Sequence, residues 1–265
     1  MTYSAPLAAI SSALKHGTGL VAAIEQGLFG ELGMEDIDAI VAEAGRFAGE
    51  VIAPLNRIGD IYGTSFKDGI VATAPGWKEA YRAWRLAGWN AVTAPAEWGG
   101  QALPQIVNAA CTEMWQAASM GFANGPMLTM AAIDALSAHG SDALKRTYLE
   151  KLVSGEWMGT MQLTEPQAGS DVGALRTRAE RAVDGSYRIK GQKYSSPMAS
   201  TISPRTSSTS CSPGCRMGRQ AHAEFPCSWC RNFCSRPMAR SVRVTTYARI
   251  RSNTNLAFMD PRPAR

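Results

Sequence analysis

The 265-residue sequence has no long uninterrupted apolar run and, over its first 193 residues, a single cysteine. Charged residues break each apolar stretch well before the roughly 20 residues that a membrane span needs, so we expect no transmembrane helix. The N-terminus MTYSAPLAAISSALKHG lacks the basic start and strong apolar run of a secretory signal. A hydrophobic content of 45% with 25 Gly excludes collagen-like, disulfide-scaffold and wholly disordered chains. One or two globular domains with a cytoplasmic location are expected.

Lysine is absent, and acidic residues are almost absent, from the C-terminal part of the chain. Residues 194–265 hold 11 Arg, two acids and five of the six Cys, which gives a charge of +9. Residues 1–193 hold 16 Lys and Arg against 20 acids, a charge of −4. The net charge of +5 is therefore the sum of a negative part and a strongly positive part of different composition, and it does not indicate a uniformly basic protein.

The first part is predicted to be helical. From Glu35 to Ile52, apolar residues recur at intervals of three and four, the spacing of one buried helix face, and Pro54 is expected to end that helix. A second helix is expected to begin near Pro75 and to end at Gly88. Its apolar stripe, most simply explained as core packing, consists of Trp77, Ala80, Tyr81, Trp84 and Ala87.

Further helices are predicted over residues 106–118, 127–139 and 142–152, the last with Ser141 as its N-cap. The segment APAEWGGQALP, residues 94–104, is predicted to be a shaped loop because of its two prolines and its Gly-Gly pair. The residues expected to be buried in this helical part are Ile40, Phe47, Val51, Trp84, Leu144 and Leu149.

The pattern changes after Trp157. The segment MGTMQLT interleaves apolar and polar residues, as a short strand does. It is followed by a predicted β-hairpin that turns at Asp184-Gly185, with Tyr187 and Ile189 alternating with basic residues. The predicted fold class is α+β, with a helical domain first and a β-domain second.

Residues 163–171, LTEPQAGSD, lie between these parts and are rich in hydroxyl groups and glycine. Exposed backbone amides in such a loop suit an anion or the polar edge of a cofactor. An ordinary loop held by Asx and Ser turns is the alternative, and the residues alone favour it.

This loop resembles the signature of the acyl-CoA dehydrogenase family, Thr-Glu-Pro-x-Ala-Gly-Ser-Asp, at the junction of an N-terminal helical bundle domain and a β-barrel-like middle domain. Residues 95–100, PAEWGG, residues 154–156, SGE, and residues 190–193, KGQK, also stand where that family has its counterparts. The resemblance covers about residues 30–193, with Gln162 as a departure from a usually small residue. The extension before it resembles the methylthiopropionyl-CoA dehydrogenase subgroup.

The resemblance implies oxidation of an acyl-CoA to the 2,3-enoyl-CoA with FAD, electron-transferring flavoprotein as partner, and a homo-oligomer. It implies that Leu163 and Thr164 lie along the flavin ring, with Met161 and Gln162 leading into that strand. Gly169 and Ser170 would approach the FAD phosphates or the acyl-CoA. The cofactor-binding candidates are Met161, Gln162, Leu163, Thr164, Gly169 and Ser170, and Ser170 is also the substrate-binding candidate.

Two carboxylates of the loop have more modest expected roles. Glu165 is expected to orient the loop rather than to act as catalytic base, and Asp171 is expected to cap local amides. The family's catalytic Glu belongs to a C-terminal helical domain before which this chain ends, so no residue here is assigned that role. Part of the FAD site also belongs to that domain and to a partner subunit, so FAD retention and activity are not expected of the chain as it stands.

The sequence after Lys193 departs from that of the family, in which an aromatic residue, Ile-Thr and a small polar turn follow at this point. The codons of the residues after Lys193 can also be read in a neighbouring reading frame, in which each new codon consists of the last base of one codon and the first two bases of the next. In that frame residues 194–199 permit FITYG, residues 224–230 permit ISLFLV, and residues 252–260 permit EHKLGIHG. Three segments in one common frame indicate a lost base, or an equivalent shift, between the codons of Lys193 and Tyr194.

The expected organisation is therefore an N-terminal extension (1–29), a helical domain (30–158), the start of a β-domain (159–193) and an out-of-frame, disordered tail (194–265). No specific nucleic-acid binding and no metal site are expected. One alternative is a helical interaction module without flavin. Another is a zinc or nucleic-acid binder that uses Cys211, Cys215, Cys227, Cys230, Cys234 and His222.

Overall fold

The computed structural model describes residues 3–67, 70–160, 163–181, 187–192 and 215–216. By its contacts the chain divides into two compact units. One unit comprises residues 1–63 with 74–127, and the other comprises residues 64–73 with 128–265. The domain ranges expected from the sequence were set by its motifs, whereas these units are defined by contacts, so the expected ranges stay a prediction.

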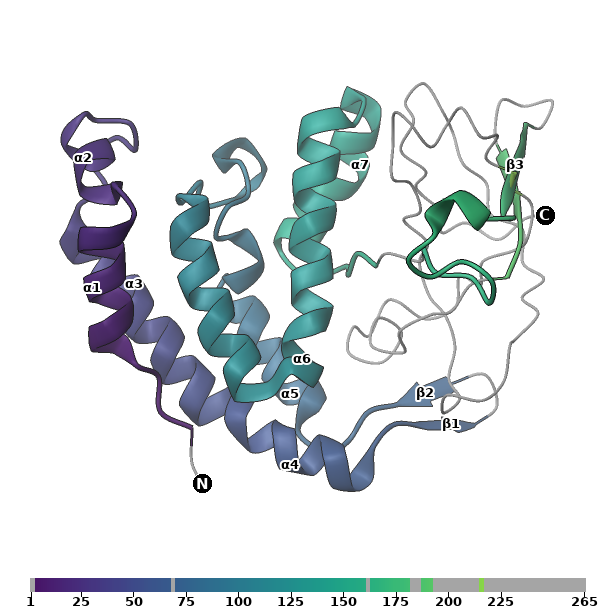
Figure 1. Cartoon of the computed structure of the whole chain (residues 1–265), viewed down its shortest axis with the longest axis horizontal. Coiled ribbons are helices and arrows are strands. Elements are labelled where there is room, and N and C mark those ends of the chain that lie inside the picture. Colours follow the sequence, from purple (N-terminus) through teal and green to yellow (C-terminus); the bar gives the residue numbers. More distant parts are fainter. Residues whose placement is uncertain (1–2, 68–69, 161–162, 182–186, 193–214, 217–265) are drawn as a thin grey trace. The chain divides into compact units, whose positions relative to one another are not determined.

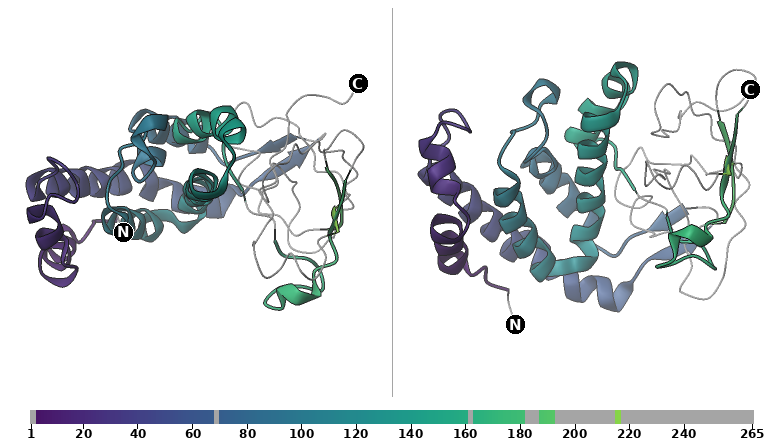
Figure 2. Two further views of the ribbon diagram at one scale, coloured as in Figure 1. Left: turned by 90° about the horizontal axis from the view of Figure 1, so that it is seen from above. Right: turned by 45° about the horizontal axis from the view of Figure 1, so that its top comes forward.

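The first unit is helical (Figure 1). Its elements are α1 (Leu7–Gly17), α2 (Leu20–Glu25), α3 (Met34–Phe47), a π-helical turn (Ala48–Ile52), α4 (Ala53–Tyr62), α5 (Trp77–Leu86), 3-10 turns at Trp89–Ala91 and Ala96–Trp98, and most of α6 (Gln105–His139). The helices α1 and α2 fall in the segment expected only as an extension. Helix α1 runs beside α3, and Asp38 of α3 accepts hydrogen bonds from Ser11 (2.7 Å) and Lys15 (2.5 Å). Figure 2 shows the two helices side by side.

The predicted stop at Pro54 is wrong, because the helix continues through it to Tyr62. Proline lacks an N–H and its ring would meet the carbonyl four residues earlier in a regular helix. A π-helical turn just before Pro54 changes the hydrogen-bond step, so that the N–H of Ala53 bonds the carbonyl of Ala48. Pro54 then falls in the first turn of α4, where no donor is needed.

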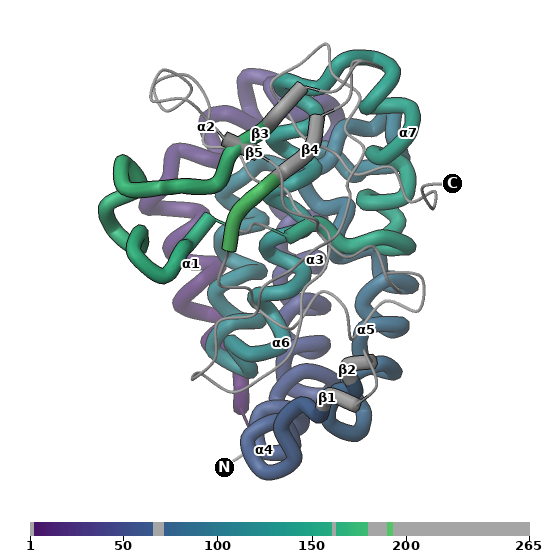
Figure 3. Tube along the Cα trace, turned by 90° about the vertical axis from the view of Figure 1, so that its right-hand side faces the viewer, coloured from purple at the N-terminus to yellow at the C-terminus, as the bar shows by residue number. Residues whose placement is uncertain are grey.

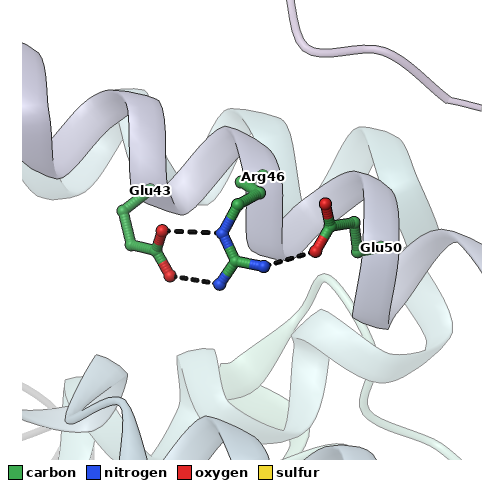
Figure 4. Close-up of polar contacts among 3 residues, drawn as sticks. All are labelled: Glu43, Arg46 and Glu50. Carbon is green, nitrogen blue, oxygen red and sulfur yellow. Dashed lines mark hydrogen bonds and ion pairs between the residues drawn. The ribbon is translucent and has the colours of Figure 1, made fainter.

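An exposed arginine spans the start of this π-helical turn. Arg46 donates to both carboxylate oxygens of Glu43, at 2.8 and 2.6 Å, and also to Glu50 (Figure 4). The three side chains are about half exposed, so solvent screens the attraction between their charges. These ion pairs therefore lie on the solvent-exposed face of the helix and are not the cause of the π-helical turn.

The core of the first unit is aromatic. Trp84 is fully buried and lies 4.5 Å from Trp115, centroid to centroid, in an edge-to-face arrangement. Phe47 and Phe122 also contact Trp84, at 6.0 and 6.1 Å. The indole N–H of Trp84 donates to the side-chain oxygen of the buried Asn90 at 2.8 Å. The α5 stripe is thus core at Trp77, Ala80, Tyr81 and Trp84, as predicted, whereas Ala87, also expected on the stripe, is exposed.

Two predicted helix boundaries and three predicted core residues differ from the structure. Helix α5 begins at Trp77 after a left-handed Gly76, so Pro75 lies outside it. The two helices predicted over 106–118 and 127–139 are present as the two parts of α6, but the break between them is the non-helical backbone of Ser119 (φ −160°, ψ 99°), so the second part begins before residue 127. Ile40, Val51 and Leu144 were expected to be buried in the core, but each is only half-buried.

The second unit contains the end of α6, helix α7 (Asp142–Val153), a 3-10 turn (Val172–Ala174) and short strands. Ser141 is the N-cap of α7, as predicted, and its hydroxyl accepts the N–H of Leu144 at 3.4 Å. Leu149 of α7 is fully buried, as expected. Among the described helices none is both long and apolar enough to cross a membrane.

The predicted β-hairpin is present. Strands β3 (Arg178–Arg181) and β4 (Tyr187–Lys190) are antiparallel, with Arg178 opposite Lys190 (Figure 3), and the short β5 (Cys215–Arg216) pairs with β3. Residues 158–160 and 163–164 of the expected MGTMQLT strand carry no strand assignment. A second hairpin, β1 (Ser65–Lys67) with β2 (Ile70–Ala72), was not predicted. The Asp184-Gly185 turn, Met161, Gln162 and nearly all of 194–265 lie outside the described residues.

Candidate functional site

The signature loop is folded back on itself around a two-residue turn. The N–H of Glu165 donates to the carbonyl of Ala168 at 2.9 Å, and the N–H of Ala168 donates to the carbonyl of Glu165 at 3.0 Å. Pro166 and Gln167 form the turn between them, and Ala168 is buried beneath it. Residues 165–168 are thereby closed into a rigid unit at the centre of the motif.

Glu165 is the buried anchor of this loop, with only 3% of its surface exposed. Its carboxylate accepts the backbone N–H of Arg176 at 2.7 Å and that of Thr177 at 3.0 Å. The side-chain amide of Gln167 donates to the same carboxylate at 2.6 Å and to the carbonyl of Ala174 at 3.3 Å. Glu165 therefore orients the loop, as predicted, by tying it to the chain that enters β3.

Asp171 caps local backbone, as predicted. Its carboxylate accepts the N–H of Gly173 at 2.9 Å and begins the 3-10 turn Val172–Ala174. Both acids of the signature therefore accept backbone amides of the residues that directly follow the loop. The groups that remain outward are Thr164, Gly169 and Ser170, which are exposed, whereas Leu163 is half-buried.

This donor set fits a flavin cofactor of the kind the sequence implies. A hydroxyl group on either side of the turn and open space at Gly169, where an added Cβ would meet nothing within 4 Å, leave room for a polar ligand. The buried Glu165 carboxylate is directed toward the amides of Arg176 and Thr177 rather than toward solvent. The roles of Leu163, Thr164, Gly169 and Ser170 in binding FAD stay a prediction.

A hydroxyl on α6 supports the chain that leads into the signature loop. Thr129 is fully buried, and its Oγ1 accepts the N–H of Gly159 at 3.2 Å and donates to the Gly159 carbonyl at 3.5 Å. Met158 and Thr160 on either side of Gly159 are also buried. Nothing in the sequence pattern singles out Thr129, because its partner lies 30 residues away.

The loop 94–104 is shaped by backbone hydrogen bonds, as predicted. The amides of Gln101, Ala102 and Leu103 donate to carbonyls of residues 91–94 at 2.8–3.0 Å. At Gly100 an added Cβ would stand 1.9 Å from the carbonyl oxygen of Ala94, so only glycine fits there. The backbone of this loop therefore packs closely against the residues at its beginning.

The described residues contain no group of three or more His, Cys, Asp or Glu placed to hold a metal ion. Cys111 is buried, and burial raises the pKa of its thiol to about 12. A thiol that stays protonated is a poor nucleophile, so Cys111 is a core residue. The cysteines of the predicted alternative zinc site lie outside the described residues, or have undescribed side chains.

Comparison with known proteins supports the resemblance. Residues 34–156 match the family model described as the acyl-CoA dehydrogenase N-terminal domain. The 3-methylmercaptopropionyl-CoA dehydrogenase of Ruegeria pomeroyi is 46% identical over 193 residues, which are 73% of this chain and 33% of that protein. The chain thus spans about a third of this relative's length.

Solved structures share the fold. Butyryl-CoA dehydrogenase from Megasphaera elsdenii is 24% identical with a TM-score of 0.52 over 62% of this chain and 41% of that one. An acyl-CoA dehydrogenase from Bacillus anthracis, complexed with FAD, is 22% identical with a TM-score of 0.50 over 62% of this chain and 26% of that one. These matches favour neither the helical-module nor the zinc-binding alternative.

Proposed function

We propose that residues 30–193 derive from an enzyme of the acyl-CoA dehydrogenase family that oxidises an acyl-CoA to the 2,3-enoyl-CoA with FAD, as the match of residues 34–156 and the 46% identical relative support. The observation that carries this proposal is the signature loop, in which both acids accept backbone amides of the residues that follow the loop and two hydroxyls stay outward. The name of the Ruegeria relative favours a short thioether acyl group as substrate.

FAD would supply the redox chemistry, as the acceptor of a hydride from the acyl chain. The backbone of Leu163 and Thr164 would hold the flavin ring, with Met161 and Gln162 leading into it. Gly169 and Ser170 would approach the phosphates or the acyl-CoA. Electron-transferring flavoprotein is the proposed electron acceptor, and a homo-oligomer in the cytoplasm is the proposed state of the in-frame enzyme.

We assign no catalytic base to the described residues. Glu165 is unsuited to the role, because its carboxylate is buried and already accepts three N–H donors. A base must reach the proton that it removes. In this family that group belongs to a C-terminal domain, and its assignment awaits the in-frame sequence.

The text after Lys193 is proposed to be out of frame. The alignment with the Ruegeria relative covers 193 residues, 73% of this chain, so about a quarter of the chain lies outside it, as an out-of-frame segment would. The aromatic residue and Thr that should follow Lys193 and shield the flavin are then replaced. We therefore propose that the 265-residue chain retains little FAD and does not dehydrogenate acyl-CoA.

Resequencing the gene across codons 193 and 194 tests the frame directly, and an additional base there is expected. In a frame-restored protein, Thr164→Ala should weaken FAD binding or slow flavin reduction, whereas Ser170→Ala should raise the acyl-CoA concentration needed for half-maximal rate. Flavin titration and steady-state kinetics measure the two effects. Unchanged FAD binding and reduction in the Thr164 variant, with an unchanged acyl-CoA requirement in the Ser170 variant, would contradict the proposed site.

A further inference from the structure

We propose that Thr129 is a positioning residue for the backbone of Leu163 and Thr164, an inference that rests on the proposed flavin site. The first support is its pairing with Gly159. A single hydroxyl serves both backbone groups of that residue, as acceptor at 3.2 Å and as donor at 3.5 Å, in a site with no solvent exposure.

The second support is what the backbone near Gly159 lacks. Met158, Gly159 and Thr160 are buried, yet these residues belong to no helix and to no strand. Buried backbone donors need partners, because water cannot reach them. Thr129 supplies the partner of the Gly159 amide that a strand neighbour would otherwise supply.

The third support is the position of Gly159 relative to the motif. It lies four residues before Leu163 and six before Glu165, which is fixed at the far end by Arg176 and Thr177. The two anchors bracket the backbone that would face the flavin. Loss of the Gly159 contact removes the support that α6 gives to the backbone leading to Leu163 and Thr164, and a site loosened by about 1 Å loses much of its effect.

A hydroxyl on a helix does not by itself imply this role. Thr147 of α7, for example, donates to the carbonyl of Ala143 at 2.7 Å, in its own helix and on an exposed face. Thr147 therefore provides a matched control for loss of a threonine hydroxyl. Ile133, which is 1% exposed and one turn beyond Thr129 on α6, provides a control for a small loss of core packing.

The first arm of the test uses the 265-residue chain and needs no flavin. Amide hydrogen exchange is compared among the wild type, Thr129→Val, which is nearly isosteric but lacks the hydroxyl, Thr129→Ser, which keeps it, and Thr147→Val. Exchange at the buried Gly159 amide, which loses its acceptor, should accelerate about tenfold in Thr129→Val alone. Unchanged exchange at Gly159 would overturn the proposal.

The second arm uses the frame-restored protein and measures the Kd for FAD together with the melting temperature. Thr129→Val should raise the Kd about tenfold, and Thr129→Ser should restore it to within about threefold of wild type. Ile133→Val should leave the Kd unchanged although it lowers the melting temperature. If the Kd follows the melting temperature across all variants, Thr129 has only a structural role and the positioning proposal fails.

The two arms keep two failures apart. If the frame-restored wild type binds no FAD, the proposed function fails, and the exchange arm alone then decides whether Thr129 holds the segment. If the wild type binds FAD and Thr129→Val binds it equally well, the proposed function stands and the role of Thr129 is refuted.

Discussion

The replacement Glu165→Gln should open the signature loop. The wild-type carboxylate accepts two backbone amides, at 2.7 and 3.0 Å, and the side-chain amide of Gln167 at 2.6 Å, in a site that is 97% buried. Glutamine has the same shape, but one oxygen becomes an NH2 group that faces a donor. The favoured orientation keeps the oxygen toward Arg176 and Gln167 and places the NH2 against the amide of Thr177.

The magnitude follows from these bonds. A hydrogen bond to a charged group contributes about 1.5–3 kcal/mol, and the bonds that survive lose about half their strength with the charge. The local opening free energy should therefore fall by about 2–4 kcal/mol. At about 1.4 kcal/mol per factor of ten, exchange of the Arg176 and Thr177 amides should accelerate roughly 30- to 700-fold.

Native-state hydrogen exchange is the assay, and Asp171→Asn is the matched control. Asp171 also accepts a backbone amide, that of Gly173 at 2.9 Å, but it is exposed, and the remaining oxygen of Asn can still accept this bond. Its replacement should change local protection by less than about 1 kcal/mol. Exchange at Arg176 and Thr177 that stays within threefold of wild type in Glu165→Gln would refute the anchoring role.

Three further outcomes are expected. Leu149→Ala empties a fully buried site and should cost about 2–5 kcal/mol of unfolding free energy by denaturant titration; an unchanged midpoint would argue against a core position. Because the pKa of Cys111 is raised to about 12, a thiol reagent at pH 8 should modify it only upon unfolding, and rapid native modification would contradict its burial. Hydrogen bonds from Lys15 and Ser11 lower the pKa of Asp38 below 3.8, so its stabilising effect is present at neutral pH and is lost as pH falls through the lowered value. Asp38→Asn should flatten acid denaturation in that range, and an identical acid profile would exclude the contribution.

Periodicity was sufficient to predict the helices whose stripes face the aromatic core. The spacing of apolar residues around Phe47 and Trp84 shows which face of each helix is buried. This pattern can be read from residues that are close together in the sequence. Pro54 shows the limit of this reasoning. Its effect depends on whether the preceding turn is α- or π-helical, and composition does not encode that choice.

The site residues that belong to the sequence motif could be predicted. The residue that joins the site only through a contact distant in sequence could not. The orienting role of Glu165 and the capping role of Asp171 follow from acids placed beside glycine and hydroxyl residues, and both roles are present. Thr129 was missed, because the spacing along α6 does not reveal that its hydroxyl meets Gly159. The β1–β2 hairpin was missed although Asp68-Gly69 is a common turn pair.

The central claim is that the sequence through Lys193 belongs to a flavoenzyme and that the text after it is out of frame. The most direct measurement compares the 265-residue chain with a protein whose frame is restored after Lys193, purified in the same way. The account predicts that the restored protein carries FAD, shows the flavin absorbance bands and reduces an electron-acceptor dye with a short acyl-CoA, whereas the 265-residue chain is colourless and inactive. Flavin-dependent dehydrogenation by the 265-residue chain, or a restored protein that binds no FAD, would contradict it.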